Sequence, residues 1–337
     1  MSSHKATDLH FTDKANDMLK TMPDYVQLYI RAIHNRTSPR TRYEYLKDIQ
    51  NFLTYLSDDY AKVSLDDLGK LDKISFEQYV EFLEHYEKNG VEFTNGRTSI
   101  KRKLSSLRKF FGYLFQNGYL KSDEIRKVEL PKLHKKEIIR LDENEATDFL
   151  DAVENGNNLT KKQNDYFNKQ SVRDLAIVYL LLSSGLRVSE CAELDITDLD
   201  LKNSCVHVVR KGGDEATVYF SDEANQYLSD YLVQRKEAKC SDQEKALFLS
   251  SRNTRMSVRA IEVMIKKYAQ RAVPSKHITP HKLRATYATN LYNATGDIYL
   301  VAETLGHKDI TTTKDHYANL SDKRKADSRN IVTFKKG

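Results

Sequence analysis

One segment, residues 204–220, alternates apolar and polar side chains, whereas most of the chain repeats its apolar residues every three or four positions. The segment is rich in Val and is interrupted by Lys211-Gly212-Gly213. Alternation on both sides of a short glycine-containing break is typical of a β-hairpin, here with a lysine at its tip. The longer spacing is typical of amphipathic helices. We therefore expect a mainly α fold with a small antiparallel β-sheet.

The N-terminal part of the chain is predicted to be a small all-helical unit. Apolar spacing predicts helices over residues 12–33, 75–89 and 98–117. Between the first two of these, a second helix is expected to begin at Ser38-Pro39, where Ser is a suitable N-cap and Pro a suitable first-turn residue. The apolar stripe of this second helix consists of Tyr45, Ile49, Phe52, Leu53 and Leu56.

The second part of the chain follows a basic stretch that has no periodicity. Residues 121–140 contain Pro131, so we expect a linker there. Helices over 143–154 and 171–184 then lead to the box Ser184-Gly185-Leu186-Arg187-Val188-Ser189-Glu190, and helices resume after the hairpin. The predicted organisation is an N-terminal domain at 1–120, a basic linker at 121–140, a second domain at 141–320 and a C-terminal tail at 321–337.

Positive charge is concentrated between Arg97 and Arg140. The chain has a net charge of +6, but this stretch alone contains thirteen Lys and Arg against four Asp and Glu, a balance of +9, so the other residues sum to −3. In the helix predicted over 98–117 the basic side chains lie off the apolar stripe, so that one face packs and the other meets phosphates. The candidate DNA-binding residues are Arg40 and Arg42 at the start of the second helix, Lys101, Arg102, Arg108 and Lys109 on the fourth, and Lys132 in the linker.

Two arginines and a tyrosine in the second half suit metal-free phosphoryl transfer. A phosphodiester resists attack because its anionic oxygens repel nucleophiles, so a catalyst must neutralise the charge that builds up in the transition state. Guanidinium groups do this bidentately without losing their proton, which suits Arg187 and Arg284. A tyrosine oxygen can attack phosphorus and leave a covalent phosphotyrosine that stores the bond energy, which suits Tyr317.

Three further residues complete this candidate site. The departing 5′ oxygen needs a proton, which the hairpin lysine Lys211 can supply. His281 and His307 can donate hydrogen bonds to the phosphate or carry the proton of the nucleophile. His277 precedes His281 by four residues, the spacing of a helical zinc pair, but Pro280 between them argues against a continuous helix. We therefore expect no metal and no other cofactor.

These boxes resemble those of the tyrosine recombinases, also called phage-type integrases. The family pattern is an arginine in a Gly-Leu-Arg-x-Ser-Glu box, a lysine in a Lys-Gly hairpin, His-x-x-Arg, Leu-Gly-His and then the nucleophilic tyrosine, and every element occurs here in that order. The segments 22–26, 41–46 and 130–134 are similar to the single-protein Xer recombinases of streptococci and lactococci, so the similarity extends over residues 20–320. The resemblance implies a catalytic set of Arg187, Lys211, His281, Arg284, His307 and the nucleophile Tyr317, with Glu190 as a supporting acid.

The spacing before the tyrosine departs from the Xer pattern. Ten residues separate His307 from Tyr317, whereas Xer proteins place the tyrosine one residue sooner, where this chain has His316. Integrases of Gram-positive mobile elements use the longer spacing, so Tyr317 stays the predicted nucleophile. The chain also has no Trp, and the position that some relatives fill with Trp is a histidine here.

The resemblance implies a two-domain DNA clamp, formed by a helical core-binding domain and an α/β catalytic domain. It implies a site-specific recombinase that acts through a 3′-phosphotyrosyl intermediate and a Holliday junction, for chromosome dimer resolution or for mobile-element integration and excision. The implied partners are double-stranded DNA with an inverted-repeat site, a homotetramer on two such sites, and an accessory protein or DNA translocase. In this family the segment after the tyrosine docks on a neighbouring protomer, and the apolar cluster Ile331-Val332-Thr333-Phe334 suits such a contact. The alternative is that this cluster folds back on its own domain.

Two other functions share the residues or the fold. A type IB topoisomerase uses the same arginine, lysine, histidine and tyrosine chemistry without pairing two sites, and relaxation of supercoils without strand exchange would indicate it. A non-catalytic DNA-binding regulator on this fold is expected to have lost at least one catalytic residue, and none is missing here.

Composition fits a globular protein with two cores. The chain has 337 residues, of which 39% are hydrophobic and 30% charged. No apolar run approaches the ~20 residues of a membrane span, and the N-terminus lacks the apolar core of a signal peptide. We therefore expect a cytoplasmic, nucleoid-associated protein without a membrane partner. Cys191, Cys205 and Cys240 are too few and too widely spaced for a disulfide framework or a zinc site.

Overall fold

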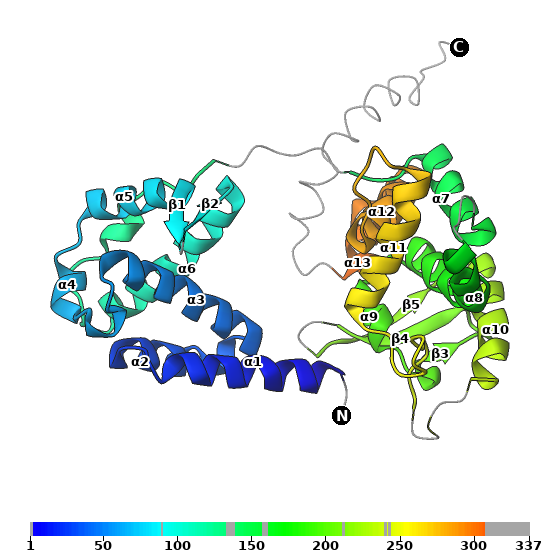
Figure 1. Cartoon of the computed structure of the whole chain (residues 1–337), viewed down its shortest axis with the longest axis horizontal. Helices are drawn as coiled ribbons and strands as arrows, with labels where there is room; N and C mark the ends of the chain where they lie inside the picture. Colours follow the sequence, from blue (N-terminus) through cyan, green and yellow to red (C-terminus); the bar gives the residue numbers. More distant parts are fainter. Residues whose placement is uncertain are drawn as a thin grey trace, which may run out of the picture. The chain divides into compact units, whose positions relative to one another are not determined.

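The computed structural model describes residues 3–88, 90–132, 139–156, 161–210, 213–238, 241 and 244–306 (Figure 1). The chain forms two compact units, Met1–Lys136 (unit 1) and Glu137–Gly337 (unit 2), and each has its own hydrophobic core. Helices dominate both, and each contains one small antiparallel sheet, so the predicted fold class is confirmed. None of the described helices is long and apolar enough to cross a membrane.

The helices of unit 1 begin where the sequence provides N-caps. The Ser38 hydroxyl accepts a hydrogen bond from the backbone N–H of Thr41 at 3.3 Å, and the helix starts at Pro39 as predicted. Asp72 caps a later helix in the same way, through the N–H of Ser75 at 2.8 Å. The helices of unit 1 are α1 (Ser3–Leu19), α2 (Asp24–Ala32), α3 (Pro39–Leu56), α4 (Leu65–Gly69), α5 (Lys73–Glu84) and α6 (Arg97–Gln116), with 3-10 turns η1 (His34–Arg36) and η2 (Tyr60–Lys62).

An aromatic cluster fills the core of unit 1. The ring centroid of Phe52 in α3 lies 4.9 Å from that of Tyr79 in α5 and 5.7 Å from that of Phe111 in α6, edge to face in both cases. Such pairs add ~0.5–1.5 kcal/mol each to the stability that burial provides. The predicted apolar stripe of α6 is buried against this cluster, and it consists of Ile100, Leu104, Leu107, Phe111 and Leu114.

The prediction of a single helix over residues 12–33 is wrong, because the chain forms two helices there. α1 ends at Leu19, and α2 begins at Asp24 with Pro23 in the N-cap position at φ −54° and ψ 150°. Proline has no N–H for a helical hydrogen bond and disfavours helical backbone at the residue before it. The chain therefore turns before Pro23, in spite of the apolar spacing that continues through it.

The predicted C-terminal end of the helix over residues 75–89 is also wrong. α5 ends at Glu84, and the chain continues as strands β1 (His85–Lys88) and β2 (Val91–Thr94), which pair antiparallel. The sequence between the strands is Asn89-Gly90, a dipeptide that favours two-residue hairpin turns, and the glycine has φ +73°. Helical apolar spacing concealed this turn signal.

The stretch predicted as a linker begins with packed structure. Glu124–Lys127 form the 3-10 turn η3, and Ile125 and Val128 are buried in the core of unit 1. Arg108 of α6 donates a hydrogen bond to the backbone carbonyl of Val128. The part of residues 121–140 up to Val128 therefore packs within unit 1.

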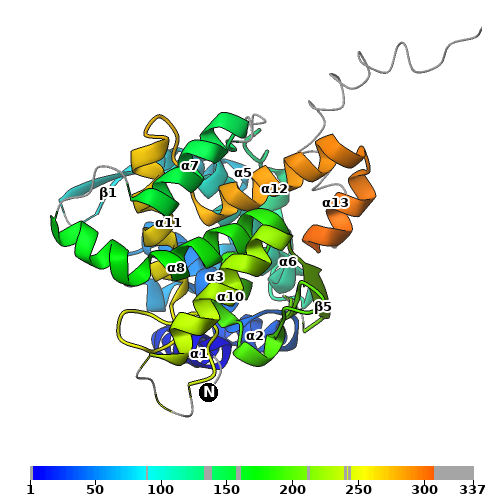
Figure 2. The ribbon, with the colours of Figure 1, turned by 90° about the vertical axis from the view of Figure 1, so that its right-hand side faces the viewer.

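The predicted hairpin of unit 2 is confirmed. Strands β4 (Cys205–Val209) and β5 (Glu215–Tyr219) pair antiparallel, and the short β3 (Leu199–Asp200) lies on the other side of β4. Helices α8 and α10 run side by side in Figure 2, and α13 packs against α12. The helices of unit 2 are α7 (Glu143–Asn155), α8 (Lys161–Ser184), α9 (Val188–Glu193), α10 (Asp222–Lys236), α11 (Val258–Ala272), α12 (Pro280–Thr295) and α13 (Ile298–Leu305), with a 3-10 turn η4 (Ile196–Asp198).

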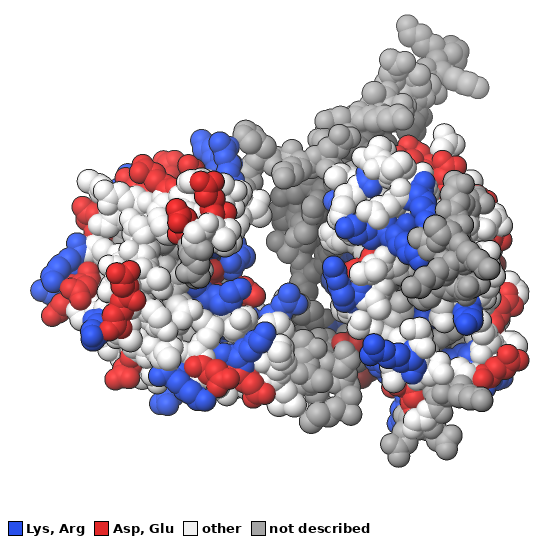
Figure 3. Space-filling model, in the orientation of Figure 1, with Lys and Arg blue, Asp and Glu red and all other residues white. Residues whose placement is uncertain are grey.

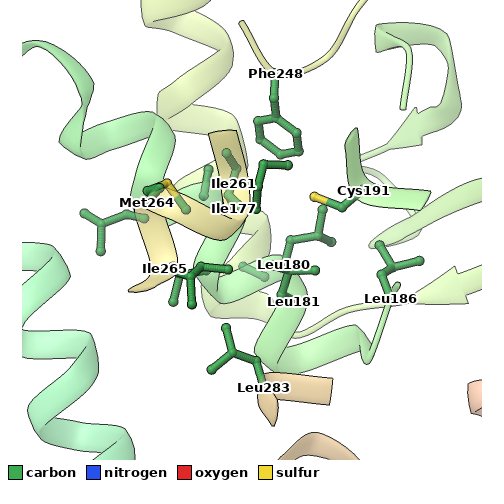
Figure 4. Close-up of a cluster of buried hydrophobic side chains, with 14 of the residues drawn as sticks. Ile177, Leu180, Leu181, Leu186, Cys191, Phe248, Ile261, Met264, Ile265 and Leu283 are labelled. Atoms are coloured by element: carbon green, nitrogen blue, oxygen red, sulfur yellow. The ribbon is translucent and has the colours of Figure 1, made fainter. Parts of the chain in front are cut away.

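The core of unit 2 forms around α8. Figure 4 shows Leu181 of α8 near Ile265 of α11 and Leu283 of α12, and all three are fully buried. Leu186 and Cys191 enter the same core, and burial raises the pKa of the Cys191 thiol. Each buried aliphatic side chain of this size stabilises the fold by ~1.5–3 kcal/mol. The backbone on both sides of the predicted arginine box is therefore anchored in the core.

Gly185→Ala is expected to destabilise unit 2 more than a matched glycine substitution. Gly185 follows α8 with φ +64°, and a Cβ there would lie 2.4 Å from Cδ1 of Tyr287. Left-handed backbone strain and steric overlap together should lower the free energy of unfolding by about 3 kcal/mol. Gly213→Ala is the control, because Gly213 has φ +90° but open space where the Cβ would lie. This variant should lower the free energy of unfolding by about 1 kcal/mol.

Urea unfolding of the two variants and the wild type measures both losses. Equal losses for Gly185→Ala and Gly213→Ala would contradict the close packing of Gly185 against Tyr287.

Candidate active site

The turn after α8 positions the first candidate arginine. Ser184 ends the helix, and its hydroxyl donates a hydrogen bond to the carbonyl of Leu180 and accepts one from the N–H of Leu186 at 3.3 Å. Gly185 takes the left-handed conformation that reverses the chain. The turn leaves Arg187 in the N-cap position of α9, with 34% of its side chain exposed.

Glu190 orients the Arg187 side chain. Its carboxylate accepts hydrogen bonds from the backbone N–H of Arg187 at 2.8 Å and from Nη1 of the same residue at 2.7 Å. Only 7% of the Glu190 side chain is exposed, so these charge-assisted bonds are shielded from water. With the backbone and the guanidinium both held by one carboxylate, Arg187 is fixed in direction before any substrate binds.

Helix α12 carries the second candidate arginine. Arg284 is 6% exposed, next to Leu283 in the core. Its Nη1 donates a hydrogen bond to the carbonyl of Gly185, and its Nη2 donates one to the carbonyl of Leu305, both at 2.5 Å. One guanidinium therefore joins the turn after α8 to the end of α13.

The C-terminal end of α13 brings the two arginines together. The helix ends at Leu305, and Gly306 follows in the left-handed conformation with φ +61°. The Gly306 carbonyl accepts a hydrogen bond from Nη2 of Arg187 at 3.3 Å, directly after the carbonyl bound by Arg284. Carbonyls at a helix C-terminus carry partial negative charge, which favours cations at this place.

This cluster of Arg187, Glu190 and Arg284 has one surplus positive charge. Its two guanidinium groups bring two positive charges against the one negative charge of the Glu190 carboxylate, which pairs with Arg187. An oxyanion with oxygens in several directions, such as the phosphate of a nucleic acid, complements such a pair. Figure 3 shows further Lys and Arg side chains gathered over α11 and α12 of this unit.

The first-turn histidine of α12 lies near this cluster in sequence. His281 is exposed and precedes Arg284 by three residues, so both side chains leave the same side of the helix. His277 lies before the helix begins, and in the described part of the chain no three His, Cys, Asp or Glu side chains form a group suited to a metal ion. Three predicted site residues lie outside the described residues, namely Lys211, His307 and Tyr317.

Arg42 and Arg102, like Arg108, make contacts within unit 1. Arg42 is 7% exposed, and its Nη1 donates to the carbonyls of His34 at 2.9 Å and Thr37 at 2.5 Å, so it fastens the turn before α3. Arg102 pairs bidentately with the buried Asp48, at 2.6 and 2.8 Å. Burial raises the pKa of the Asp48 carboxyl, and the hydrogen bonds from Arg102 oppose that rise.

The remaining predicted DNA-binding side chains differ in exposure. Lys109 is exposed, and its Nζ donates to the Tyr45 hydroxyl at 2.7 Å. The Arg40 guanidinium lies 5.4 Å from the ring centroid of Phe11, a cation–π contact that leaves its edge open to an anion. The remaining candidates are Lys101 and Arg108, which are half-buried, and Lys132, which is exposed.

A basic and aromatic patch that the sequence patterns did not predict lies where α1 meets α3. The rings of Phe11 and Tyr43 lie 5.6 Å apart, and Lys14 and Lys47 lie 5.8 and 5.6 Å from the centroid of Tyr43. The spacing of Tyr43 and Lys47 on one helix was a signal for part of this patch. The contribution of α1 depends on how the helices pack, which local spacing does not specify.

A third arginine, also missed, reaches the end of α13. Nη2 of Arg210 donates to the carbonyl of Thr304 at 2.8 Å, and Nη1 donates to the carbonyl of Glu303 at 3.2 Å. Arg210 directly precedes the predicted general acid Lys211. No local pattern relates it to a helix more than ninety positions later in the chain.

Two family models match most of this chain. The model of the phage integrase family matches residues 139–324, and that of the phage integrase N-terminal SAM-like domain matches residues 26–118. Among curated proteins, the chain is 33% identical to tyrosine recombinase XerS of Streptococcus agalactiae, over 93% of this chain and 96% of the relative. It is 32% identical to tyrosine recombinase XerS of Streptococcus thermophilus, with the same coverage.

Solved structures share the fold. The integrase of transposon Tn1549, in complex with transposon right end DNA, aligns with a TM-score of 0.67 at 19% identity, over 91% of this chain and 99% of that chain. The XerH site-specific recombinase bound to a palindromic difH substrate aligns with a TM-score of 0.65 at 16% identity, over 91% and 95%. The resemblance seen in the sequence boxes is therefore confirmed, and the chain belongs to the phage integrase family, the family of the tyrosine recombinases.

Proposed function

We propose that this protein is a site-specific recombinase that cuts DNA strands and joins them to new partners. The observation that carries the proposal is the convergence of Arg187 and Arg284 on the end of α13, with Glu190 orienting the first of them. Guanidinium groups bind phosphate oxygens through charge-assisted, bidentate hydrogen bonds. Membership of the family, and 33% identity to a tyrosine recombinase over nearly the whole chain, support the same activity.

The arginines act on the scissile phosphate. Arg187 and Arg284 bind its nonbridging oxygens, whose negative charge increases as the fifth ligand approaches phosphorus. Because both guanidinium groups are already held by carbonyls and a carboxylate, little reorganisation is needed when the substrate arrives. His281 and His307 donate further hydrogen bonds to the same phosphate.

Tyr317 and Lys211 carry out the bond exchange. The phenolic oxygen of Tyr317 gives its proton to His281 or His307 and attacks phosphorus, the bond from phosphorus to the 5′ oxygen breaks, and a 3′-phosphotyrosyl ester forms. Lys211 gives a proton to the departing 5′ oxygen, which leaves as a hydroxyl group. In the second step the 5′ hydroxyl of another strand attacks the ester and releases the tyrosine. Two such exchanges pass through a Holliday junction, and no high-energy cofactor is consumed.

Unit 1 binds the DNA duplex. Basic side chains of unit 1, among which Arg40, Arg102, Lys109 and Lys132 are exposed, contact the phosphate backbone. The protein acts where its DNA lies, in the nucleoid. We assign residues 1–120 to a core-binding domain, 121–140 to a basic linker whose first part, up to Val128, packs on that domain, 141–320 to the catalytic domain and 321–337 to a tail.

Recombination needs two sites at once, so the active form is an assembly. Two protomers bind one inverted-repeat site, and two occupied sites pair in a homotetramer. The tail at 321–337 docks on a neighbouring protomer, which links placement of the nucleophile to assembly. The same strand chemistry serves a chromosomal site or the ends of a mobile element.

Tyr317→Phe should bind a target site as the wild type does and form no covalent adduct, because only the phenolic oxygen is lost. The assay uses a target site nicked next to the scissile phosphate, followed by a denaturing gel. Tyr299→Phe is the matched control, since Tyr299 is 66% exposed on α13 and should keep full adduct formation. An adduct that survives in Tyr317→Phe would assign the nucleophile to another residue.

Lys211→Ala should slow strand cleavage by ~10²–10⁴-fold on ordinary DNA and far less on DNA whose 5′ bridging oxygen is replaced by sulfur. A thiolate leaves without a proton, so a missing general acid matters little there. Arg187→Ala is the control, and its defect should persist on both substrates because the nonbridging oxygens are unchanged. Equal defects of Lys211→Ala on both substrates would mean that the lysine acts through charge or position.

A further inference from the structure

Three arginines bind the backbone carbonyls of residues 303–306, where the described part of the chain ends. The Glu303 and Thr304 carbonyls accept hydrogen bonds from Arg210 at 3.2 and 2.8 Å. The Leu305 carbonyl accepts a hydrogen bond from the guanidinium of Arg284, and the Gly306 carbonyl accepts one from that of Arg187. The catalytic mechanism uses two of these arginines on the phosphate, and it assigns no task to Arg210.

Gly306 leaves room for the Arg210 guanidinium. A Cβ at Gly306 would lie 1.7 Å from Nη1 of Arg210, and the backbone has φ +61°. The arginine therefore packs directly on the glycine that ends α13. A cation at a helix C-terminus is stabilised by the helix dipole, by ~0.3–1 kcal/mol at the surface. The contact is thus specific in geometry as well as favourable in charge.

Arg210 also lies at the mouth of the lysine hairpin. Val209 is the last residue of β4 and pairs with Glu215 at the start of β5. Beyond this pair, the backbone N–H of Arg210 donates to the carbonyl of Asp214 at 2.8 Å, and the N–H of Gly213 donates to the carbonyl of Arg210 at 3.0 Å. The Arg210 backbone therefore closes the turn that contains Lys211, while its side chain is bound to α13.

We propose that Arg210 is a positioning residue that fastens the Lys211 hairpin to the end of α13. The general acid and the segment that leads to the nucleophile are thereby placed together around the arginine pair. The inference rests on the proposed function and adds a residue to it. Loss of Arg210 would leave both arginines of the phosphate site intact and would release the hairpin.

The test combines Arg210→Ala with the two substrates that distinguish leaving groups. On ordinary DNA the variant should cleave about 10–100-fold more slowly than the wild type, the size of effect that misplacing a catalytic group by an ångström produces. On DNA with a 5′ bridging sulfur it should cleave within about threefold of the wild type, because the leaving group needs no proton. Arg252→Ala is the charge-matched control, since Arg252 is exposed on a turn of the same unit, and it should match the wild type on both substrates.

Two further variants separate positioning from charge. Arg210→Lys keeps the charge, but one ammonium group does not reproduce the planar fork that spans two carbonyls, so it should show the same sulfur-rescued defect. The double variant Arg210→Ala with Lys211→Ala should be no slower than Lys211→Ala alone, because both changes remove the same proton transfer.

The outcomes are distinct. Sulfur rescue of Arg210→Ala together with non-additivity supports the proposal. Wild-type rates for Arg210→Ala, equal slowing on both substrates, or full activity of Arg210→Lys would each overturn it. A wild-type protein that cleaves neither substrate would instead refute the proposed function, so the two failures are not confused.

Discussion

Two permanently charged guanidinium groups must lie close together in this protein, and their repulsion is the constraint on which unit 2 depends. Like charges that lie close together repel each other unless opposite charges or dipoles offset the repulsion. The protein offsets this repulsion with the carboxylate of Glu190 and with backbone carbonyls, which attract cations without adding a full negative charge. A second carboxylate would neutralise the cluster, whereas carbonyls leave it one positive charge with which to bind a phosphate.

Two glycines in the left-handed conformation direct backbone carbonyls toward the arginines. Gly185 and Gly306 both take the left-handed conformation, and their carbonyls accept hydrogen bonds from Arg284 and Arg187 in turn. The helices that carry the arginines are held by the core, in which Leu186 follows one of these glycines directly. The tyrosine recombinase chemistry thus depends on main-chain geometry as much as on the side chains of the sequence boxes.

The sequence predicted elements better than it predicted contacts. The hairpin at 204–220 and the family followed from short-range patterns, while the turns at Pro23 and Asn89-Gly90 had signals that helical spacing outweighed. The pairing of Arg102 across 54 positions and of Arg210 across 93 positions exists only after the helices pack, so no local rule predicts it. The roles of the lysine, the second histidine and the tyrosine stay predictions from the resemblance.

The central claim is that the arginine pair neutralises charge on the scissile phosphate. Replacing one nonbridging oxygen of that phosphate by a methyl group removes the charge and keeps the leaving group. On ordinary DNA, Arg187→Ala should cleave ~10²–10³-fold more slowly than the wild type, and on the methylphosphonate it should regain most of that loss. An Arg187→Ala variant that is slowed equally on both substrates would contradict the account.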